Sequence, residues 1–488
     1  MRKFEDEQLH FGEVPVSEIK IDLKSRDDIP QILLGLQAIY KDKKVRNKIF
    51  EILKQLSTKK KGRPGMHFWN IFVLSMIKLG LNCDYDRLHE LANQHLTIRQ
   101  MLGVGMFDNT YFSAKTIQNN VRLFTPEILD KINIVIVKFG HDLISKKKKI
   151  YAKCDSFVVE TNVHFPTDNG ILYDSVRKVV QLTAFVCDKY NVKGWRQKHY
   201  NIRQIKYLIR KITKIKRSNP RLESSILKKQ NDLKSAYAEL IKISESFIVK
   251  SKLSMDEIGK KSKNCMQNIF VNSVFKDINY YINFAKKFID QIERRVFKKE
   301  KIPHSEKTFS IFEPHTEWIC KGKSKAPFEL GKRVAIVEDQ NGFILSNKVM
   351  DKETDEKIAV SIVEKTKKDF ENLILCSFDK GFYSKENKEK LSQILDLSIL
   401  PKKGKLSKKD KEIEYSKEFI KYRKKHAAIE SAINALEVHG LDKCLDKKIR
   451  GFKRHVSLAI VSRNIQIYGA HLKKKQIRNF KKHKIKIA

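Results

Sequence analysis

Hydrophobic residues in the first 145 positions recur at helical spacing. Between residues 30 and 60, and in shorter runs from 66 to 102, they fall on one face of a helix at a time, which predicts helices joined by brief turns. Such a series is compatible with a helix-turn-helix module and also with a generic helical bundle. The pattern predicts an N-terminal helical region over residues 1–145, with DNA binding as its expected role.

The pattern changes at Ile150, where β-branched and aromatic residues become frequent and predict strands as far as about Val186. Three apolar stripes between residues 200 and 300 then predict helices with very basic outer faces. Apolar stripes of this kind are typical of helix faces that pack against one another in a core, so we do not expect an active site among them.

Strands are expected again after Pro303, in the segments TFSIF, RVAIVED, GFILSNKVM and LILCSFD. The QNG sequence at 340–342 is typical of a hairpin turn. Helices follow from Lys385 to Leu395 and from about Phe419 to Val438. The chain therefore predicts an α/β fold whose mixed-sheet core, residues 146–199 and 304–472, is split by a helical insertion over 200–303. Residues 473–488 predict a basic, poorly ordered tail.

The charge of the chain is strongly unbalanced. Lys and Arg number 100 against 57 Asp and Glu, a formal net charge of +43, which favours a polyanionic partner: DNA, RNA or an acidic membrane surface. An AT-rich coding sequence explains part of the lysine excess, but hardly all of it. The 7 cysteines form no CxxC pair, and the N-terminus lacks an apolar signal core. No uncharged run is long enough to span a bilayer, so we expect a cytoplasmic protein.

The basic segment KKKGRPG at 59–65 separates two predicted helices. It is similar to an AT-hook, in which a Gly-Arg-Pro core lies in the minor groove of A·T-rich DNA. A basic linker whose Pro64 starts a helix is the more frequent explanation of such a segment. Arg63 is kept as a candidate DNA contact beside that alternative.

Two acidic residues stand where the pattern predicts buried strands. Asp155 lies within IYAKCDSFVV, where an ionised carboxylate is costly unless a cation or hydrogen bonds compensate it. Asp379 ends LILCSFD and precedes a Gly turn, a position at which α/β sheets place active groups. On the predicted helix KKHAAIESAINALE, Glu430 lies at the edge of an apolar face and could be directed at both aspartates.

From about Arg63 to Leu472 the chain resembles the DDE-type insertion-sequence transposases, most closely the ISNCY group. The resemblance rests on the order and joint presence of DSFVVETNVHFPTD, FEPHTEWICKGK, VEDQNGFILSNKVM, FDKGFYS, HAAIESAINALEVHGLDKC and GFKRHVSLAIVSRNI. It implies an RNase H-like core whose acidic triad holds divalent metal. Position by position, that triad is Asp155, Asp379 and Glu430.

The implied activity is metal-dependent DNA strand cleavage and strand transfer of the protein's own insertion sequence. Carboxylate oxygens suit two Mg²⁺ ions, for which Mn²⁺ can substitute, and such ions activate water and stabilise a leaving oxygen. By family analogy Asp155 bridges both ions, while Asp379 and Glu430 each contact one. The expected partners are double-stranded DNA, as element terminal repeats and target DNA, and a second copy in a homodimer on DNA. The expected location is the bacterial nucleoid, with neither ATP nor a membrane involved.

The chain departs from some DDE transposases, which carry Tyr, Arg and Lys around the helix glutamate. Its equivalent positions hold Arg423, His426 and Glu437, so hairpin-forming chemistry is not carried over. Arg423 and His426 could contact phosphate or belong to a solvated helix face. The candidate DNA contacts are Arg63, Lys380, Lys402, Lys403, Arg423 and His426.

Other polar residues are weaker candidates. Glu160, His164 and Asp168 could orient Asp155 without binding metal themselves, although PTDNG favours a turn role for Asp168. The EPHTEW segment offers His315 and Glu317, for which structural hydrogen bonding is the more frequent role. Two other functions stay open: a non-catalytic, domesticated DNA-binding protein, and an RNase H-like nuclease that never joins ends.

Overall fold

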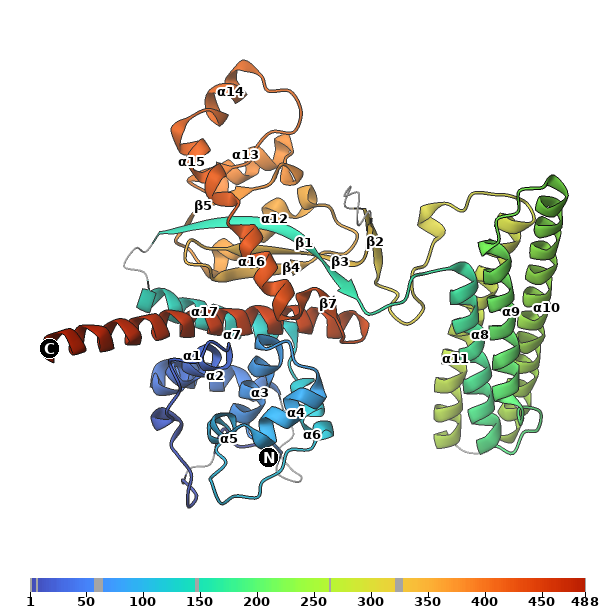
Figure 1. Ribbon diagram of the computed structural model, residues 1–488, viewed down its shortest axis with the longest axis horizontal. Helices are drawn as coiled ribbons and strands as arrows, with labels where there is room; N and C mark the ends of the chain where they lie inside the picture. The colour runs from blue at the N-terminus through green and yellow to red at the C-terminus, as the bar shows by residue number, and fades with distance from the viewer. Residues whose placement is uncertain are drawn as a thin grey trace. The chain divides into compact units, whose positions relative to one another are not determined.

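The computed structural model describes residues 2–5, 8–56, 65–144, 149–262, 265–320 and 328–487. Its chain divides into two compact units (Figure 1). We call Met1–Asn162 together with Glu317–Ala488 the core unit, and Val163–Thr316 the helical unit. In the described residues, no helix is both long enough and apolar enough to cross a bilayer.

The core unit opens with a set of helices, as the sequence predicts, and continues into a sheet with further helices. Its N-terminal helices are α1 (Ile29–Lys41), α2 (Lys43–Leu53), α3 (Phe68–Gly80), α4 (Tyr85–Gln94), α5 (Leu96–Met101), α6 (Ala114–Val121) and α7 (Pro126–Ile144). Its strands are β1 (Ile150–Thr161), β2 (Glu317–Cys320), β3 (Phe328–Glu338), β4 (Ile344–Val349), β5 (Leu373–Phe378), β6 (Leu397–Ile399) and β7 (Lys443–Cys444). The later helices are α12 (Asp355–Asp369), α13 (Lys385–Ile394), α14 (Lys408–Glu414), α15 (Lys417–His426), α16 (Ile429–Leu436) and α17 (Lys448–Ile487).

The sheet is open and mixed, so the prediction of a mixed-sheet α/β core is confirmed. Its strand order is β2-β3-β1-β5-β6, with β4 also on β3 and β7 also on β1. The central strand β1 runs antiparallel to β3 and parallel to β5. The predicted QNG hairpin joins β3 to β4, and Gly342 supplies the positive φ of 89° at its turn.

Alternate residues of the strands face two different layers. Ala335 and Val337 of β3 belong to the hydrophobic cluster that includes Ile358 of α12. Val334 and Ile336 belong to the cluster that includes α16 and the N-terminal helices. The sheet is therefore covered on both faces, and its strand ends are the places where polar groups can reach solvent.

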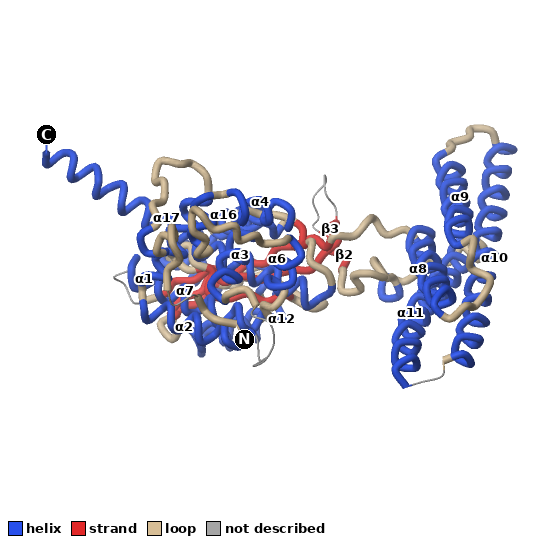
Figure 2. Tube along the Cα trace, turned by 90° about the horizontal axis from the view of Figure 1, so that it is seen from below, coloured by secondary structure: helices blue, strands red, loops and turns tan. Residues whose placement is uncertain are grey.

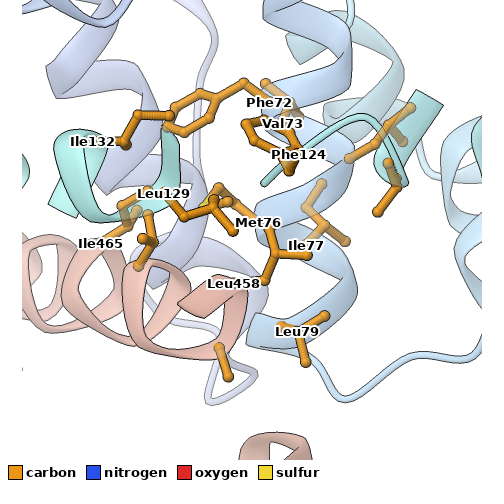
Figure 3. Close-up of a cluster of buried hydrophobic side chains, with 14 of the residues drawn as sticks. Phe72, Val73, Met76, Ile77, Leu79, Phe124, Leu129, Ile132, Leu458 and Ile465 are labelled. Atoms are coloured by element: carbon orange, nitrogen blue, oxygen red, sulfur yellow. The ribbon is translucent and has the colours of Figure 1, made fainter. Parts of the chain in front are cut away.

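Helix α3 packs mainly against α17, and its side chains share a hydrophobic cluster with residues of α7 and α17 (Figure 3). All of its 13 residues are buried, Asn70, Ser75 and Lys78 included. A helix that reads DNA must expose one face to a groove. If the N-terminal region contains a reading helix, it is not α3.

The helical unit consists of four long helices, α8 (Asp168–Lys189), α9 (Lys198–Arg217), α10 (Glu223–Lys261) and α11 (Cys265–Val296) (Figure 2). Helix α8 packs against the other three. Two pairs of polar groups meet inside this bundle: the Trp195 indole N–H donates to Ser254 Oγ at 2.9 Å, and the Thr183 and Ser251 hydroxyls lie 2.6 Å apart.

The strand prediction over 150–186 is correct for β1 and wrong beyond it. The segment from Asp168 is helix α8, capped by Thr167, whose hydroxyl accepts from the Gly170 N–H. Its apolar residues recur at helical spacing, and packing against α10 and α11 overrides their β-branched character. The observed helical unit is therefore longer than the insertion predicted over 200–303.

Two further local predictions differ from the structure. The TFSIF segment is a loop, because Ser310 Oγ accepts from the backbone N–H groups of Phe312 and Glu313 and turns the chain. The tail predicted from residue 473 instead continues α17 as helix to Ile487. The KKKGRP segment (59–64), with its candidate Arg63, lies outside the described residues.

Close packing of α1 and α17 provides a test of the core unit. A Cβ at Gly469 would lie 1.7 Å from the Gln31 carbonyl oxygen, so Gly469→Ala should force the helices apart. We expect a loss of about 2–4 kcal/mol in the free energy of unfolding, measured by urea denaturation. The control is Gly259→Ala in α10, where a Cβ meets nothing within 4 Å and no loss is expected. Equal stability of the two variants would contradict the packing.

Candidate active site

Asp155 lies in the middle of β1, between the buried Cys154 and Phe157, and its own side chain is only partly buried. Its residue partner on β3 is Ile336, which faces the layer containing α16. Because paired residues project to the same face of a sheet, the Asp155 carboxylate is on the α16 side.

Asp379 follows the last residue of β5. The parallel register pairs Cys154 with Phe378, so the next residues, Asp155 and Asp379, continue side by side. Neighbouring strands lie about 4.8 Å apart, which brings these two carboxylates to the same end of the β1–β5 pair. Asp379 is exposed, and its carbonyl accepts from the Phe382 N–H in the short helical turn Lys380–Phe382.

Glu430 is in the first turn of α16, which packs on β1. Ile429 and Leu436 bury the inner face of this helix and leave Glu430 exposed. The helix predicted from 419 to 438 is broken at Ala427–Ala428, where α15 ends and α16 begins. Because of this break, the axis of α16 does not have to continue that of α15 where α16 packs on β1.

Electrostatic coupling connects these carboxylates. The pKa of Asp155 is raised to about 6, chiefly by burial and in addition by the charges of Asp379, Asp355 and Glu430, while the Ser156 N–H acts in the opposite direction. That N–H donates to Asp155 Oδ1 at 2.7 Å. Within the described part of the chain, no ion pair involves Asp155, Asp379 or Glu430.

A fourth carboxylate, Asp355, was not identified from the sequence. It is the first residue of α12, and its Oδ1 accepts from Ser156 Oγ at 2.6 Å. A Cβ at Gly381 would lie 3.3 Å from Asp355 Oδ2 and 3.9 Å from Asp379 Oδ2, so the two carboxylates flank one small space. An acidic residue in a first helical turn is ordinary in a sequence, which is why this one gave no signal.

The candidate DNA contacts differ in their surroundings. Lys402 Nζ donates to Asp410 at 2.5 Å, and Arg423 lies 3.8 Å from Glu414, so both have acidic partners. Lys380, beside Asp379, and Lys403 are exposed.

His426 lies near the carboxylate group, since the charges of Asp379 and Glu430 act on it. Its Nδ1 is 3.1 Å from Ser377 Oγ, on β5, the strand that precedes Asp379. Burial lowers the pKa of His426, although Asp379 and Glu430 act in the opposite direction.

The weaker candidates have partners elsewhere. In the helical unit, His164 lies 3.5 Å from Asp174, Asp168 pairs with Arg295, and His315 lies 3.6 Å from Glu313. In the core unit, Glu317 accepts from the buried Lys332 at 2.7 Å, and Glu160 is exposed near the end of β1.

Comparison with protein-family models, with curated proteins and with solved structures gave no match.

The donors around Asp155 suit a hard divalent cation. Carboxylate oxygens are the ligands that Mg²⁺ prefers. Asp355 lies 3.8 Å from Arg333, whereas in the described residues no ion pair involves the other three carboxylates. Among the described residues, no three His, Cys, Asp or Glu side chains form a ready-made metal cluster. Asp379 and Glu430 are exposed, which leaves their carboxylates open to a cation from solvent, so the chemistry of this donor set fits such an ion.

Proposed function

We propose that this protein is a DDE-type transposase with an RNase H-like core, which cleaves DNA strands and transfers the ends of its own insertion sequence. The observation that carries the proposal is the grouping of Asp155, Asp379 and Glu430. These residues are far apart in the sequence, come from two strands and a helix, and interact electrostatically without a protein cation. The resemblance to DDE transposases implies the same kinds of structural element as the source of the three carboxylates.

Asp155, Asp379 and Glu430 would hold two Mg²⁺ ions, which when bound supply an activated water and stabilise the charge on a leaving oxygen. Asp155 is fixed by the Ser156 N–H, so it provides the rigid part of the site. Asp379 and Glu430 face solvent, where a DNA phosphate can approach. Lys380 is placed next to Asp379 to contact that phosphate.

The partners in this proposal are double-stranded DNA and a second copy of the chain, without ATP. A non-catalytic DNA-binding descendant has no need for this grouping of acids, and chains of that kind are free to lose one. A nuclease that never joins ends has the same need for the site, so only the reaction products separate it from a transposase.

The test is incubation of the full chain with labelled element ends, Mg²⁺ and a target plasmid. A transposase gives labelled joined product, whereas a nuclease gives shortened or nicked ends only. Protein that binds the ends but produces neither product would overturn the proposed function.

Asp355 should contribute to the activity through its negative charge beside Asp155 and Asp379. Asp355→Asn keeps an oxygen that can accept from Ser156 but removes one charge beside Asp155 and Asp379, so we expect cleavage to fall about 10- to 100-fold. Glu356→Gln, an exposed acid in the same helical turn, is the matched control and should cleave normally. Plasmid nicking with Mg²⁺ measures both, and an unaffected Asp355 variant would remove this residue from the site.

A further inference from the structure

Helix α9 of the helical unit has an unusual distribution of charge. None of its 20 residues is Asp or Glu. Its apolar residues Ile205, Leu208 and Ile212 are buried against the bundle. The opposite face carries a row of exposed cations, which we call the α9 stripe: Arg203, Lys206, Arg210, Lys214 and Arg217.

The α9 stripe is continuous along the helix. At 3.6 residues per turn its members fall within an arc of about 80° and extend over roughly 21 Å. Tyr207 lies in the same row and is 66% exposed. One DNA strand presents a phosphate about every 3.4 Å of helix axis, so a row of this length faces several phosphates.

Other cations of the same helix contact a carboxylate or an aromatic ring, whereas the members of the stripe do not, among the described residues. Lys198 lies 3.3 Å from Asp188, Lys211 lies 3.4 Å from Glu239, and Lys216 lies over the Tyr237 ring. In the described residues, no ion pair or side-chain hydrogen bond involves a member of the stripe. Like charges spaced three or four residues apart repel one another, so this face is destabilised unless a polyanion covers it.

We propose that the α9 stripe is a binding surface for the phosphate backbone of double-stranded DNA, separate from the acidic residues of the core unit. This inference rests on the proposed function only in its choice of DNA as the polyanion. A membrane is a poorer fit, because the apolar face that would enter lipid is already buried in the bundle. The surface contacts phosphates and not base edges, so it binds without regard to sequence.

The experiment compares full-length variants by fluorescence anisotropy with a labelled DNA duplex, in EDTA so that no reaction occurs. The stripe variant replaces all members of the α9 stripe with Gln. The control replaces an equal number of exposed lysines on α10 and α11 with Gln: Lys228, Lys234, Lys242, Lys260 and Lys276. Circular dichroism confirms that both variants keep their helices.

We expect the stripe variant to bind about 10- to 100-fold more weakly near 0.1 M salt. Its salt dependence should flatten by about 0.9 for each phosphate that the protein no longer neutralises. The control should change much less in both respects. An unchanged salt slope in the stripe variant, or an equally weakened control, would overturn the proposal. So would a preference of the wild type for duplex RNA or for phosphatidylserine vesicles over DNA. None of these results bears on the carboxylates, whose test is strand cleavage with Mg²⁺.

Discussion

Replacement of Asp379 by Asn should reduce strand cleavage by at least about 1,000-fold while leaving DNA binding intact. The amide has the size of the carboxylate but offers a neutral oxygen, which is a poor ligand for a hard cation. Loss of one such ligand removes several kcal/mol of transition-state stabilisation, and each 1.36 kcal/mol corresponds to about tenfold in rate. Binding depends on Lys and Arg, so it should persist and weaken steeply with salt, as in the wild type. A gel assay on end-labelled DNA with Mg²⁺, beside a binding titration, measures both.

The comparison needs an acid of the same sheet that is outside the site. Asp396, exposed just before β6, serves that purpose, and Asp396→Asn should cleave at the wild-type rate. Glu430→Gln should behave like the Asp379 variant, and combining the two should add little, because residues that act as a unit are not additive. Cleavage by the Asp379 variant at the wild-type rate would show that the carboxylate assignment is wrong.

Replacement of Asp155 by Asn should stabilise the metal-free protein at pH 7.5 by about 1–3 kcal/mol. In the folded chain the pKa of Asp155 is raised from 3.8 to about 6, mainly by burial. The folded state therefore holds this proton more tightly than the unfolded state. The stabilisation that protonated Asp155 gives the folded state is complete below about pH 4 and is lost as the pH rises through about 6. The Asn variant has no proton to lose and escapes that penalty.

Urea denaturation in EDTA at pH 4.5 and 7.5 measures the effect as the difference between the wild type and the Asp155 variant. The difference should be small at the lower pH and grow at the higher one. Millimolar Mg²⁺ should then stabilise the wild type but not the variant, because binding to the folded state alone raises stability. A gap between the two proteins that does not change with pH would contradict the shifted pKa.

Strands β1, β3, β4 and β5 were predictable because their apolar runs are short and end at clear turn signals, as at QNG before β4, whereas the shorter strands β2, β6 and β7 were not predicted. Helix α8 was not, since β-branched residues such as Val176 and Val179 favour strands until the bundle around them is known. Glu430 could be anticipated from its place beside Ile429 on a helix. Asp355 could not, because it meets Ser156 only through the return of the chain after β4.

The point at which the helical unit leaves the sheet affects the order in which this protein can fold. Glu160 of β1 and Glu317 of β2 both pair with Gly331, on opposite sides of β3. The whole helical unit must therefore be synthesised before β1 meets its antiparallel neighbour, a wait of roughly 10–30 s at ribosomal speed. Helices α1 and α3 wait longer, because they pack against α17, near the end of the chain. The helical unit needs no later residue for its own core, so the molecule should assemble from its middle outwards.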